Sequence, residues 1–294
     1  MTVPPGQPAD PQAQQPALPA CVRHPGRPTG LRCSRCDRPA CVECLRPASV
    51  GQHCVDCVAE GRRTTRRPVT ISGARTGRQP VVLPIIVALN VILFVVTVIQ
   101  ARSITNLQNS SLFDRWELVP LLTRNGYWWQ LITAGFLHVN VIHILMNMIA
   151  LWVIGRDLER VLGSLRFAAV YLLGVLGGNV AVFVFAAPNV GEAGASTGVF
   201  ALMGGLLVVV YRLKLNPSQV IGLIVVNLVI SVVIPNISLL GHVGGLITGA
   251  AVTFALVNVP AERRTLWQSV TVVAAVVVLL GLVLVRAPQL PVLT

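Results

Sequence analysis

A single serine among small residues is the first feature of the sequence that could do chemistry. Residues 191–205 read GEAGASTGVFALMGG, so Ser196 stands among glycines and alanines at the start of a long apolar run. A serine hydroxyl is a weak nucleophile, and it becomes a useful one only beside a general base, most often a histidine. The histidines that lie in apolar surroundings are therefore the next residues to consider.

Three histidines lie in or beside apolar segments, namely His138, His143 and His242. Ionisable side chains there are costly and are candidates for function. His242 is the predicted base for Ser196 in nucleophilic acyl transfer. A Ser-His-Asp triad also needs a carboxylate behind the histidine, but no acidic residue lies inside an apolar segment near His242. The sequence therefore favours a Ser–His dyad.

Acyl transfer also needs hydrogen-bond donors for the oxygen that becomes negatively charged. His143 and Asn147 are four residues apart, so they would share one face of a helix. We expect these two side chains, with the backbone N–H of Ser196 and the first amides of its helix, to supply the donors.

A second group of chemically active residues is confined to the N-terminal part of the chain. All seven cysteines fall between residues 21 and 57, and with one histidine they form four pairs of C-x2-C or C-x2-H spacing: Cys21/His24, Cys33/Cys36, Cys41/Cys44 and Cys54/Cys57. Eight such ligands suffice for two closed tetrahedral zinc sites of the structural kind. A segment this short cannot build an adequate apolar core, so metal would supply its folding free energy.

The order in which these ligands pair stays open. Interleaved pairing, as in the cross-braced B-box zinc finger that the segment resembles, gives one ion Cys21, His24, Cys41 and Cys44, and the other ion Cys33, Cys36, Cys54 and Cys57. Sequential pairing is the alternative, and His53 could replace Cys54. We expect a cytosolic protein partner rather than nucleic acid, because few aromatic residues accompany the arginines of the segment.

The elements that position these residues follow from composition. The chain has 294 residues, of which 54% are hydrophobic and only 12% charged, whereas soluble domains carry about 25% charged residues. The apolar residues form blocks close to the roughly 20 residues that a membrane-spanning helix needs. These blocks are 81–101, 139–155, 166–187, 196–212, 217–235, 238–258 and 266–286. The sequence therefore predicts an all-α, multi-pass membrane protein.

The distribution of positive charge predicts how the chain crosses the bilayer. Arginines are dense between residues 23 and 78, before the first block, and positive residues favour the cytoplasmic side. With the N-terminus inside and the C-terminus outside, Ser196, His143, Asn147 and His242 all fall at one depth near the extracytoplasmic side. Glu192 is the only acidic residue at that end of the fourth block. The outer segment 102–138, rich in tryptophan, would cover this layer.

The same residue types also occur in membrane proteins that are not hydrolases. A serine in a membrane helix often bonds to its own backbone, and an intramembrane histidine can link helices or relay protons. A transporter that relays protons through the three histidines is disfavoured by the scarcity of carboxylates in the spans. A catalytically silent membrane scaffold that recruits cytosolic partners through the cysteine segment is the main alternative to an enzyme.

Four motifs resemble those of the rhomboid intramembrane serine proteases. GASTGVF is similar to their GxSG-type nucleophile motif, FLHVNVIHILMNM to their H-x4-H-x3-N segment, and GHVGGLITG to the region of their catalytic histidine. GRDLERVLG is similar to the glycine and glutamate that close their second span. Two positions depart from the family pattern, because Thr197 follows Ser196 in place of glycine and Gln130 follows Trp129 in place of arginine.

This resemblance implies a six-helix core with one extra C-terminal span. It implies Ser196 as nucleophile, His242 as general base, and His143 and Asn147 as stabilisers of the oxyanion. The implied reaction is hydrolysis of a peptide bond in or near a transmembrane segment of a membrane-protein substrate, with no metal or cofactor in the chemistry. The zinc segment lies outside the family core.

The expected organisation has five parts. They are a disordered tail over 1–20, a zinc-binding module over 21–60, a basic juxtamembrane linker over 61–80, a protease core over 81–258, and an extra transmembrane helix with a tail over 259–294. The expected location is the cell membrane, with the lipid bilayer as a constant partner.

Overall fold

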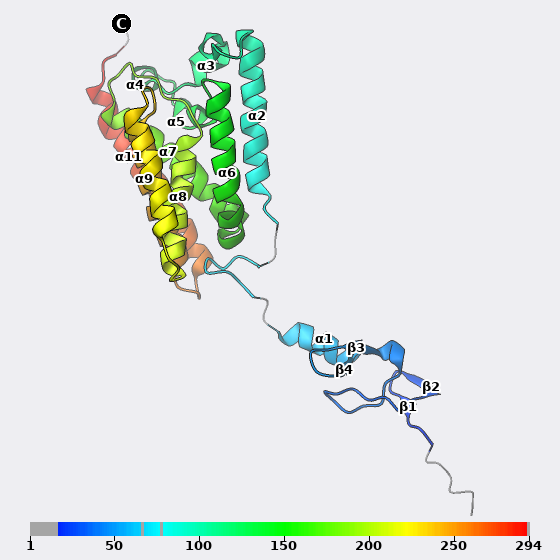
Figure 1. The fold of residues 1–294 in the computed structure, drawn as a ribbon. Helices are drawn as coiled ribbons and strands as arrows, with labels where there is room; N and C mark the ends of the chain where they lie inside the picture. Colours follow the sequence, from blue (N-terminus) through cyan, green and yellow to red (C-terminus); the bar gives the residue numbers. More distant parts are fainter. Residues whose placement is uncertain (1–16, 66–67, 77–78, 293–294) are drawn as a thin grey trace, which may run out of the picture. The chain divides into compact units, whose positions relative to one another are not determined.

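The computed structural model describes residues 17–65, 68–76 and 79–292. The chain divides into two compact units, Met1–Arg67 and Pro68–Thr294 (Figure 1). Most of the disordered tail predicted over 1–20 lies outside the described residues.

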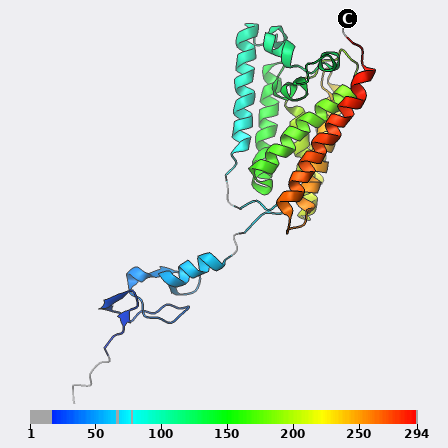
Figure 2. The ribbon, with the colours of Figure 1, turned by 180° about the vertical axis from the view of Figure 1, so that it is seen from behind.

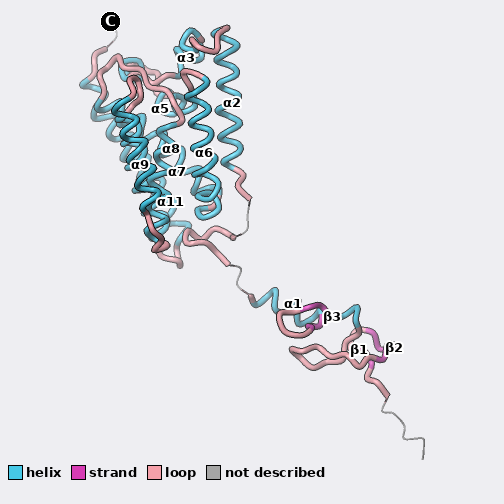
Figure 3. Tube along the Cα trace, viewed as in Figure 1, coloured by secondary structure: helices cyan, strands magenta, loops and turns pink. Residues whose placement is uncertain are grey.

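The first unit is small and is built around its cysteines. Strand β1 (Ala20–Cys21) pairs antiparallel with β2 (His24–Pro28), and β3 (Leu45–Pro47) pairs antiparallel with β4 (Gln52–Cys54). A single 3-10 turn, η1 (Val42–Cys44), precedes β3, and helix α1 (Val55–Thr64) follows β4 (Figure 3). Apart from Ala40 and Leu45, its buried apolar cluster consists of cysteines. Sulfur therefore occupies the place of a conventional core.

Over its described residues the second unit is a bundle of seven long helices, and each predicted apolar block forms one of them. They are α2 (Val82–Ala101), α6 (Val141–Leu162), α7 (Ser164–Phe185), α8 (Ser196–Arg212), α9 (Ser218–Val233), α10 (Leu239–Asn258) and α11 (Arg264–Arg286). Figure 2 shows the C-terminal helix α11 beside α7, with which it is in contact. The predicted fold class, a helical multi-pass membrane protein with one extra C-terminal helix, is confirmed.

Five of these helices are long and apolar enough to cross a membrane, namely α2, α6, α7, α10 and α11 extended to Gln289. The other two, α8 and α9, are apolar but have only 17 and 16 residues. A helix of 17 residues is about 26 Å long, whereas the hydrocarbon core of a bilayer is about 30 Å thick. A span as short as α8 therefore leaves room for one of its ends to lie below the level of the longer helices.

Glycines bring α7, α8 and α10 into close contact. A methyl group added at Gly245 would collide with the backbone of Thr197, and one added at Gly249 would collide with the backbone of Ala201. A methyl group added at Gly177 of α7 would collide with the side chain of Thr248 of α10. Small residues permit this approach of helix backbones, and the glycine stripe of GHVGGLITG therefore sets the spacing between α10 and α8.

The start of α2 is capped by a glutamate of α6. The Glu159 carboxylate accepts hydrogen bonds of 2.8–2.9 Å from the backbone N–H groups of Val81, Val82 and Leu83, and one of 2.6 Å from the hydroxyl of Ser164. These amides have no partner within their own helix.

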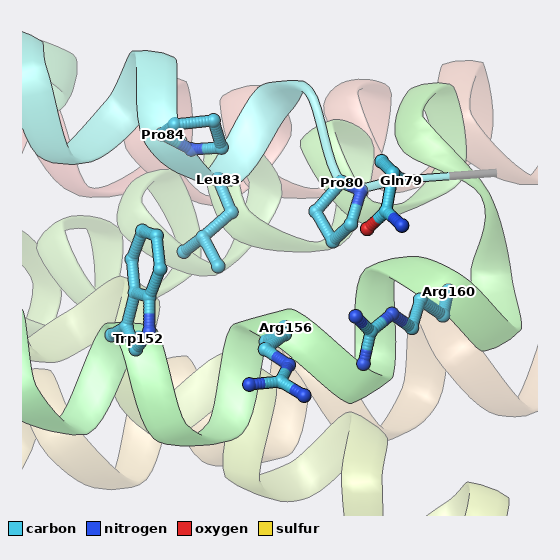
Figure 4. Close-up of a pocket in the computed structure, with 7 residues that line it drawn as sticks. All are labelled: Gln79, Pro80, Leu83, Pro84, Trp152, Arg156 and Arg160. Carbon is cyan, nitrogen blue, oxygen red and sulfur yellow. The ribbon is translucent and has the colours of Figure 1, made fainter.

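A pocket of about 380 Å³ lies next to this junction, between α2, α6 and the segment before α2 (Figure 4). None of the residues that line it is a predicted catalytic residue. They are Gln79, Pro80, Leu83, Pro84, Trp152, Arg156 and Arg160.

The segment between α2 and α6 folds into short helices. They are η2 (Leu107–Asn109), α3 (Ser111–Trp116), α4 (Pro120–Arg124), α5 (Gln130–Thr133) and η3 (Ala134–Phe136). Gln130 is fully buried and ties this segment together. Its Oε1 accepts from the Thr123 hydroxyl at 2.8 Å, and its Nε2 donates to the Arg115 carbonyl at 3.3 Å. The glutamine that departs from the family pattern thus anchors the segment.

Candidate active site

Ser196 is the first residue of α8, and a glycine two residues earlier shapes its surroundings. Gly194 has φ +151°, a conformation that side chains rarely adopt. A methyl group at Gly194 would lie 2.9 Å from the His143 ring and 3.4 Å from the Ser196 Oγ. The imidazole of His143 and the hydroxyl of Ser196 therefore both border the space that a side chain at Gly194 would fill.

Within the described part of the chain, the Ser196 hydroxyl is only half-buried and makes no hydrogen bond. It does not bond back to its own helix, as serines in membrane helices often do. Its position at the helix start also places it beside the first backbone amides of α8, which have no acceptor within the helix. A free hydroxyl can act as a nucleophile toward a carbonyl, and neighbouring amides of this kind can bind an oxyanion.

His242 lies in the first turn of α10, and its buried ring stacks on Phe200 of α8. The two ring centroids are 4.1 Å apart and the ring planes differ by 15°. Phe200 is four residues, or about one helical turn, after Ser196. The close approach of Gly241 and Gly245 to Thr197 holds α10 against this same turn. The imidazole of His242 is thereby held against the first turns of α8.

The hydrogen-bond partner of His242 is a serine. The Nδ1 atom of His242 lies 2.6 Å from the Oγ of Ser231, which belongs to α9. Glu192, the acidic residue at this end of the bundle, lies beside Ser238 and Gly241 instead. Burial raises the pKa of the Glu192 carboxyl to about 7, and the contact with Ser238 opposes that rise. Within the described residues no carboxylate contacts His242.

His143 and Asn147 lie on one face of α6, as their spacing predicts. The side chain of Asn140 caps the helix by accepting a 2.8 Å hydrogen bond from the backbone N–H of His143. The Asn147 amide donates to the His143 carbonyl at 3.1 Å, which leaves its second N–H for another acceptor. His138 packs edge-on against His143, with ring centroids 5.1 Å apart. The structure thus brings His143 next to Ser196, while Asn147 lies one turn further along α6.

Sequence reasoning missed two residues of this cluster, Ser231 and Phe200. A signal for Ser231 was available, because it is a serine near the outer end of the fifth apolar block and therefore at the depth of His242. No comparable signal marks Phe200, since aromatic residues are ordinary in apolar helices.

The N-terminal unit holds two groups of four candidate metal ligands. One comprises Cys21, His24, Cys41 and Cys44, and the other comprises Cys33, Cys36, Cys54 and Cys57. In each group the ligand atoms lie within 4.8 Å of one another, and His53 is a member of neither group. The grouping is that of the interleaved pairing and not that of the sequential one.

The distances between these atoms fit a tetrahedral metal. The Nδ1 of His24 lies 3.3 Å from the Cys41 sulfur and 3.4 Å from the Cys44 sulfur, and the Cys36 and Cys54 sulfurs are 3.8 Å apart. Metal–ligand bonds of zinc length give tetrahedron edges of about 3.6 Å for N–S and about 3.8 Å for S–S. The backbone N–H of Cys54 also donates to the Cys33 sulfur at 3.1 Å. The donor set and its geometry therefore fit a structural metal ion in each group.

Comparison with known proteins shows which family the second unit resembles. Residues 125–259 match the Rhomboid domain family. The chain is 32% identical over 225 residues to the rhomboid protease GluP of Bacillus subtilis, and this match covers 74% of the chain and 42% of GluP.

Two further relatives agree with this match. The putative rhomboid protease YdcA of Bacillus subtilis is 33% identical over 145 residues, which cover 48% of the chain and 72% of YdcA. RHOMBOID-like protein 4 of Arabidopsis thaliana is 33% identical over 138 residues, which cover 45% of the chain and 35% of that protein. The chain therefore spans less than half the length of GluP and of RHOMBOID-like protein 4.

Proposed function

Because this chain belongs to the rhomboid family, we propose that it is a serine endopeptidase that hydrolyses a peptide bond in or near the transmembrane segment of other membrane proteins. Relatives that are named rhomboid proteases support this proposal. The arrangement around Ser196 supports it independently.

In this proposal Ser196 is the nucleophile and His242 the general base. The Nε2 atom of His242 takes the proton of the Ser196 hydroxyl while the Oγ forms a bond to the scissile carbonyl carbon. The same nitrogen then protonates the departing amine as the peptide C–N bond breaks. A water molecule, activated by His242 in turn, releases the acyl group and restores the serine.

The donors for the oxyanion come from two helices. The first amides of α8, which lack acceptors within the helix, are proposed to bind the carbonyl oxygen as it becomes negative. The His143 ring borders the same space beside Gly194 as the Ser196 hydroxyl and is the proposed second donor. Asn147 has one amide N–H beyond the bond to its own helix and is the proposed third donor. The chemistry needs no metal.

One observation carries the proposal: the His242 ring stacks on Phe200 one turn after Ser196, while Gly194 admits the His143 ring beside the Ser196 hydroxyl. Three separate helices, α6, α8 and α10, thus supply a donor, a nucleophile and a base at one end of the bundle. The shortness of α8 is consistent with a Ser196 hydroxyl that lies below the membrane surface, where a transmembrane segment of a substrate could reach it.

Labelling with a fluorophosphonate probe tests this function. We expect the wild-type protein to be labelled covalently and to cleave tagged single-span proteins on co-expression. Ser196→Ala and His242→Ala should abolish both readouts. Ser111→Ala, which makes the same chemical change at an exposed position of α3, should leave both unchanged. Undiminished cleavage by a folded Ser196→Ala protein would exclude this mechanism.

The cysteine-rich unit supports a second role. We propose that it binds two structural zinc ions in a B-box-like arrangement and recruits a cytosolic protein partner. A catalytically silent scaffold would keep this role alone. Cross-linking in cells, measured beside substrate cleavage, separates the two functions. Cys33→Ser should lose the cytosolic partner, Ser196→Ala should keep it, and a silent scaffold would show no cleavage in the wild type either.

The placement of the chain in the membrane is also part of the proposal. The arginine-rich segment before α2 supports a cytoplasmic N-terminus, with the active site and the C-terminus toward the extracytoplasmic side. The parts proposed are the module over 21–60, the linker over 61–80, the protease core over 81–258 and the extra helix over 259–294. Reporter fusions after residues 80 and 292 would test the two termini of the membrane region.

A further inference from the structure

The helix that supplies the hydrogen-bond partner of His242 is otherwise poorly buried. Within α9, every residue of which is described, only Ile224 and Ser231 are buried. Ser231 retains 5% of its exposure, although its neighbours Val229, Val232 and Val233 are exposed. A polar side chain is thus one of two residues that α9 turns inward, and it faces the proposed base.

The contacts of Ser231 determine the direction of its hydrogen bonds. Its Oγ lies 2.7 Å from the backbone carbonyl of Asn227 and 2.6 Å from the Nδ1 of His242. A carbonyl can only accept, so the hydroxyl proton of Ser231 is directed to Asn227. The Ser231 oxygen then accepts a hydrogen bond from Nδ1–H of His242. This arrangement leaves the Nε2 of His242 without a proton and able to accept one from Ser196.

Two contacts therefore hold the His242 ring from different directions. The hydrogen bond to Ser231 acts in the plane of the ring, and Phe200 covers one of its faces. In a Ser-His-Asp triad the carboxylate both selects the tautomer and stabilises the imidazolium. A neutral hydroxyl can select the tautomer and orient the ring, but it contributes no charge.

We propose that Ser231 is a positioning residue that keeps His242 in the Nδ1–H tautomer and aims its Nε2 at Ser196. This inference rests on the proposed function, because it gives the proposed base its orientation. The Ser231 hydroxyl, which belongs to a different helix, would thus take the orienting role that a carboxylate has in a Ser-His-Asp triad.

Substitutions at Ser231 test the role of the hydroxyl. We expect Ser231→Ala and Ser231→Val to lower kcat for a cleaved substrate by about 10- to 100-fold, the size of a lost hydrogen bond to a group that becomes charged in the transition state. KM should change by less than about twofold, because the hydrogen bond acts on the chemical step. Ser231→Thr, which has the shape of valine but keeps a hydroxyl, should retain most of the activity.

The rate of fluorophosphonate labelling should fall in parallel with kcat. This small probe needs the base but no docking of a transmembrane helix, so it separates base positioning from substrate binding. Ile224→Ala removes the other buried side chain of α9 and is the packing control. If Ile224→Ala slows labelling as much as Ser231→Ala, or if Ser231→Val is as active as Ser231→Thr, the positioning role is wrong.

A second measurement is independent of activity. The ¹⁵N chemical shifts of His242 report its tautomer in the Ser196→Ala protein, which is inactive by design. We expect the Nδ1–H form with Ser231 or threonine present, and a mixture of tautomers with alanine or valine. The same tautomer in all four proteins would overturn the inference. A wild-type protein without labelling or cleavage would overturn the proposed function alone, and the tautomer measurement would still decide the role of Ser231.

Discussion

The imidazole of His242 lies flat against the phenyl ring of Phe200, with centroids 4.1 Å apart and planes 15° apart. Both rings are buried, and they join α10 to α8 one turn from Ser196. The stack covers one face of the proposed base, so a change at Phe200 should affect catalysis as well as stability. Phe200→Ala is expected to slow labelling of Ser196 by roughly 2- to 10-fold, the worth of one aromatic pair.

Phe200→Tyr is the matched control for this prediction, because it keeps the ring. Labelling rates of the two variants, measured beside their thermal unfolding, distinguish lost stacking from lost folding. Equal rates in Phe200→Ala and Phe200→Tyr would mean that the stack does not orient His242.

The contact of Gly245 with the backbone of Thr197 predicts that α10 tolerates no side chain there. Because backbone atoms cannot rotate away, Gly245→Ala should lower the free energy of unfolding by about 1–3 kcal/mol, the usual cost of overpacking. A methyl group added at Gly222 of α9 would have no heavy atom within 4 Å. Gly222→Ala should therefore be neutral or stabilise the helix by up to about 1 kcal/mol. Thermal unfolding in detergent compares the two variants. Equal destabilisation by Gly245→Ala and Gly222→Ala would contradict the conclusion that Gly245 sets the spacing between α10 and α8.

The capping of α2 by Glu159 predicts a stability effect at the opposite end of α6. Glu159→Ala leaves the N–H groups of Val81, Val82 and Leu83 without their acceptor. The bond from Leu83 is buried and the other two are part-buried, so the loss should lower the free energy of unfolding by at least the cost of one unsatisfied buried donor, about 1–3 kcal/mol. Asp157 lies two residues away and makes only an exposed pair with Arg160. Asp157→Ala should change the free energy of unfolding by less than about 1 kcal/mol. Urea or thermal unfolding of the pair tests whether the cap stabilises the bundle.

The buried carboxyl of Glu192 predicts a pH-dependent stability. Burial raises its pKa to about 7, the charge of Glu117 adds to the rise, and the contact with Ser238 opposes it. The folded state therefore holds this proton more tightly than the unfolded state, in which the pKa of the carboxyl is near its ordinary value of 4.5. Stability should be fully present below about pH 4.5 and should fall by up to about 3 kcal/mol as the pH rises through 7.

Glu192→Gln removes this titration. Thermal unfolding measured between about pH 4.5 and about pH 8 should show a wild-type protein that loses stability toward the alkaline end, whereas the variant loses less over the same range. A variant that follows the wild-type curve would show that another group is responsible.

The two ligand groups predict a stoichiometry of two zinc ions per chain. Cys54→Ser should reduce the zinc content to about one ion and destabilise the N-terminal unit, because structural zinc supplies folding energy to such modules. His53→Ala should leave both ions in place, since His53 belongs to neither group. Metal analysis of the purified variants, with and without a strong chelator, gives the number of zinc ions bound per chain. Loss of zinc in His53→Ala would revive the alternative ligand.

The number and order of the helices could be predicted from the sequence, because each span is encoded by a local run of apolar residues. The sequence also predicted Ser196, His143, Asn147 and His242 at one depth, since alternating spans return to the same end of the bundle. The spacing of cysteine and histidine predicted the eight candidate metal ligands in the same local way. Their interleaved grouping was one of two open pairings, and spacing along the chain could not choose between them.

The contacts of these side chains could not be predicted from the sequence, because they depend on how the helices pack. The partner of His242 was sought among the carboxylates, yet the structure gives Nδ1 to Ser231, on a helix whose sequence is nearly all apolar. The stack on Phe200 and the position of the His143 ring beside Gly194 depend on how closely the helices pack. A run of apolar residues predicts that a helix is buried or faces lipid. The rotation of the helix about its axis and its distance from a neighbour are set by the packing of small residues on several helices at once.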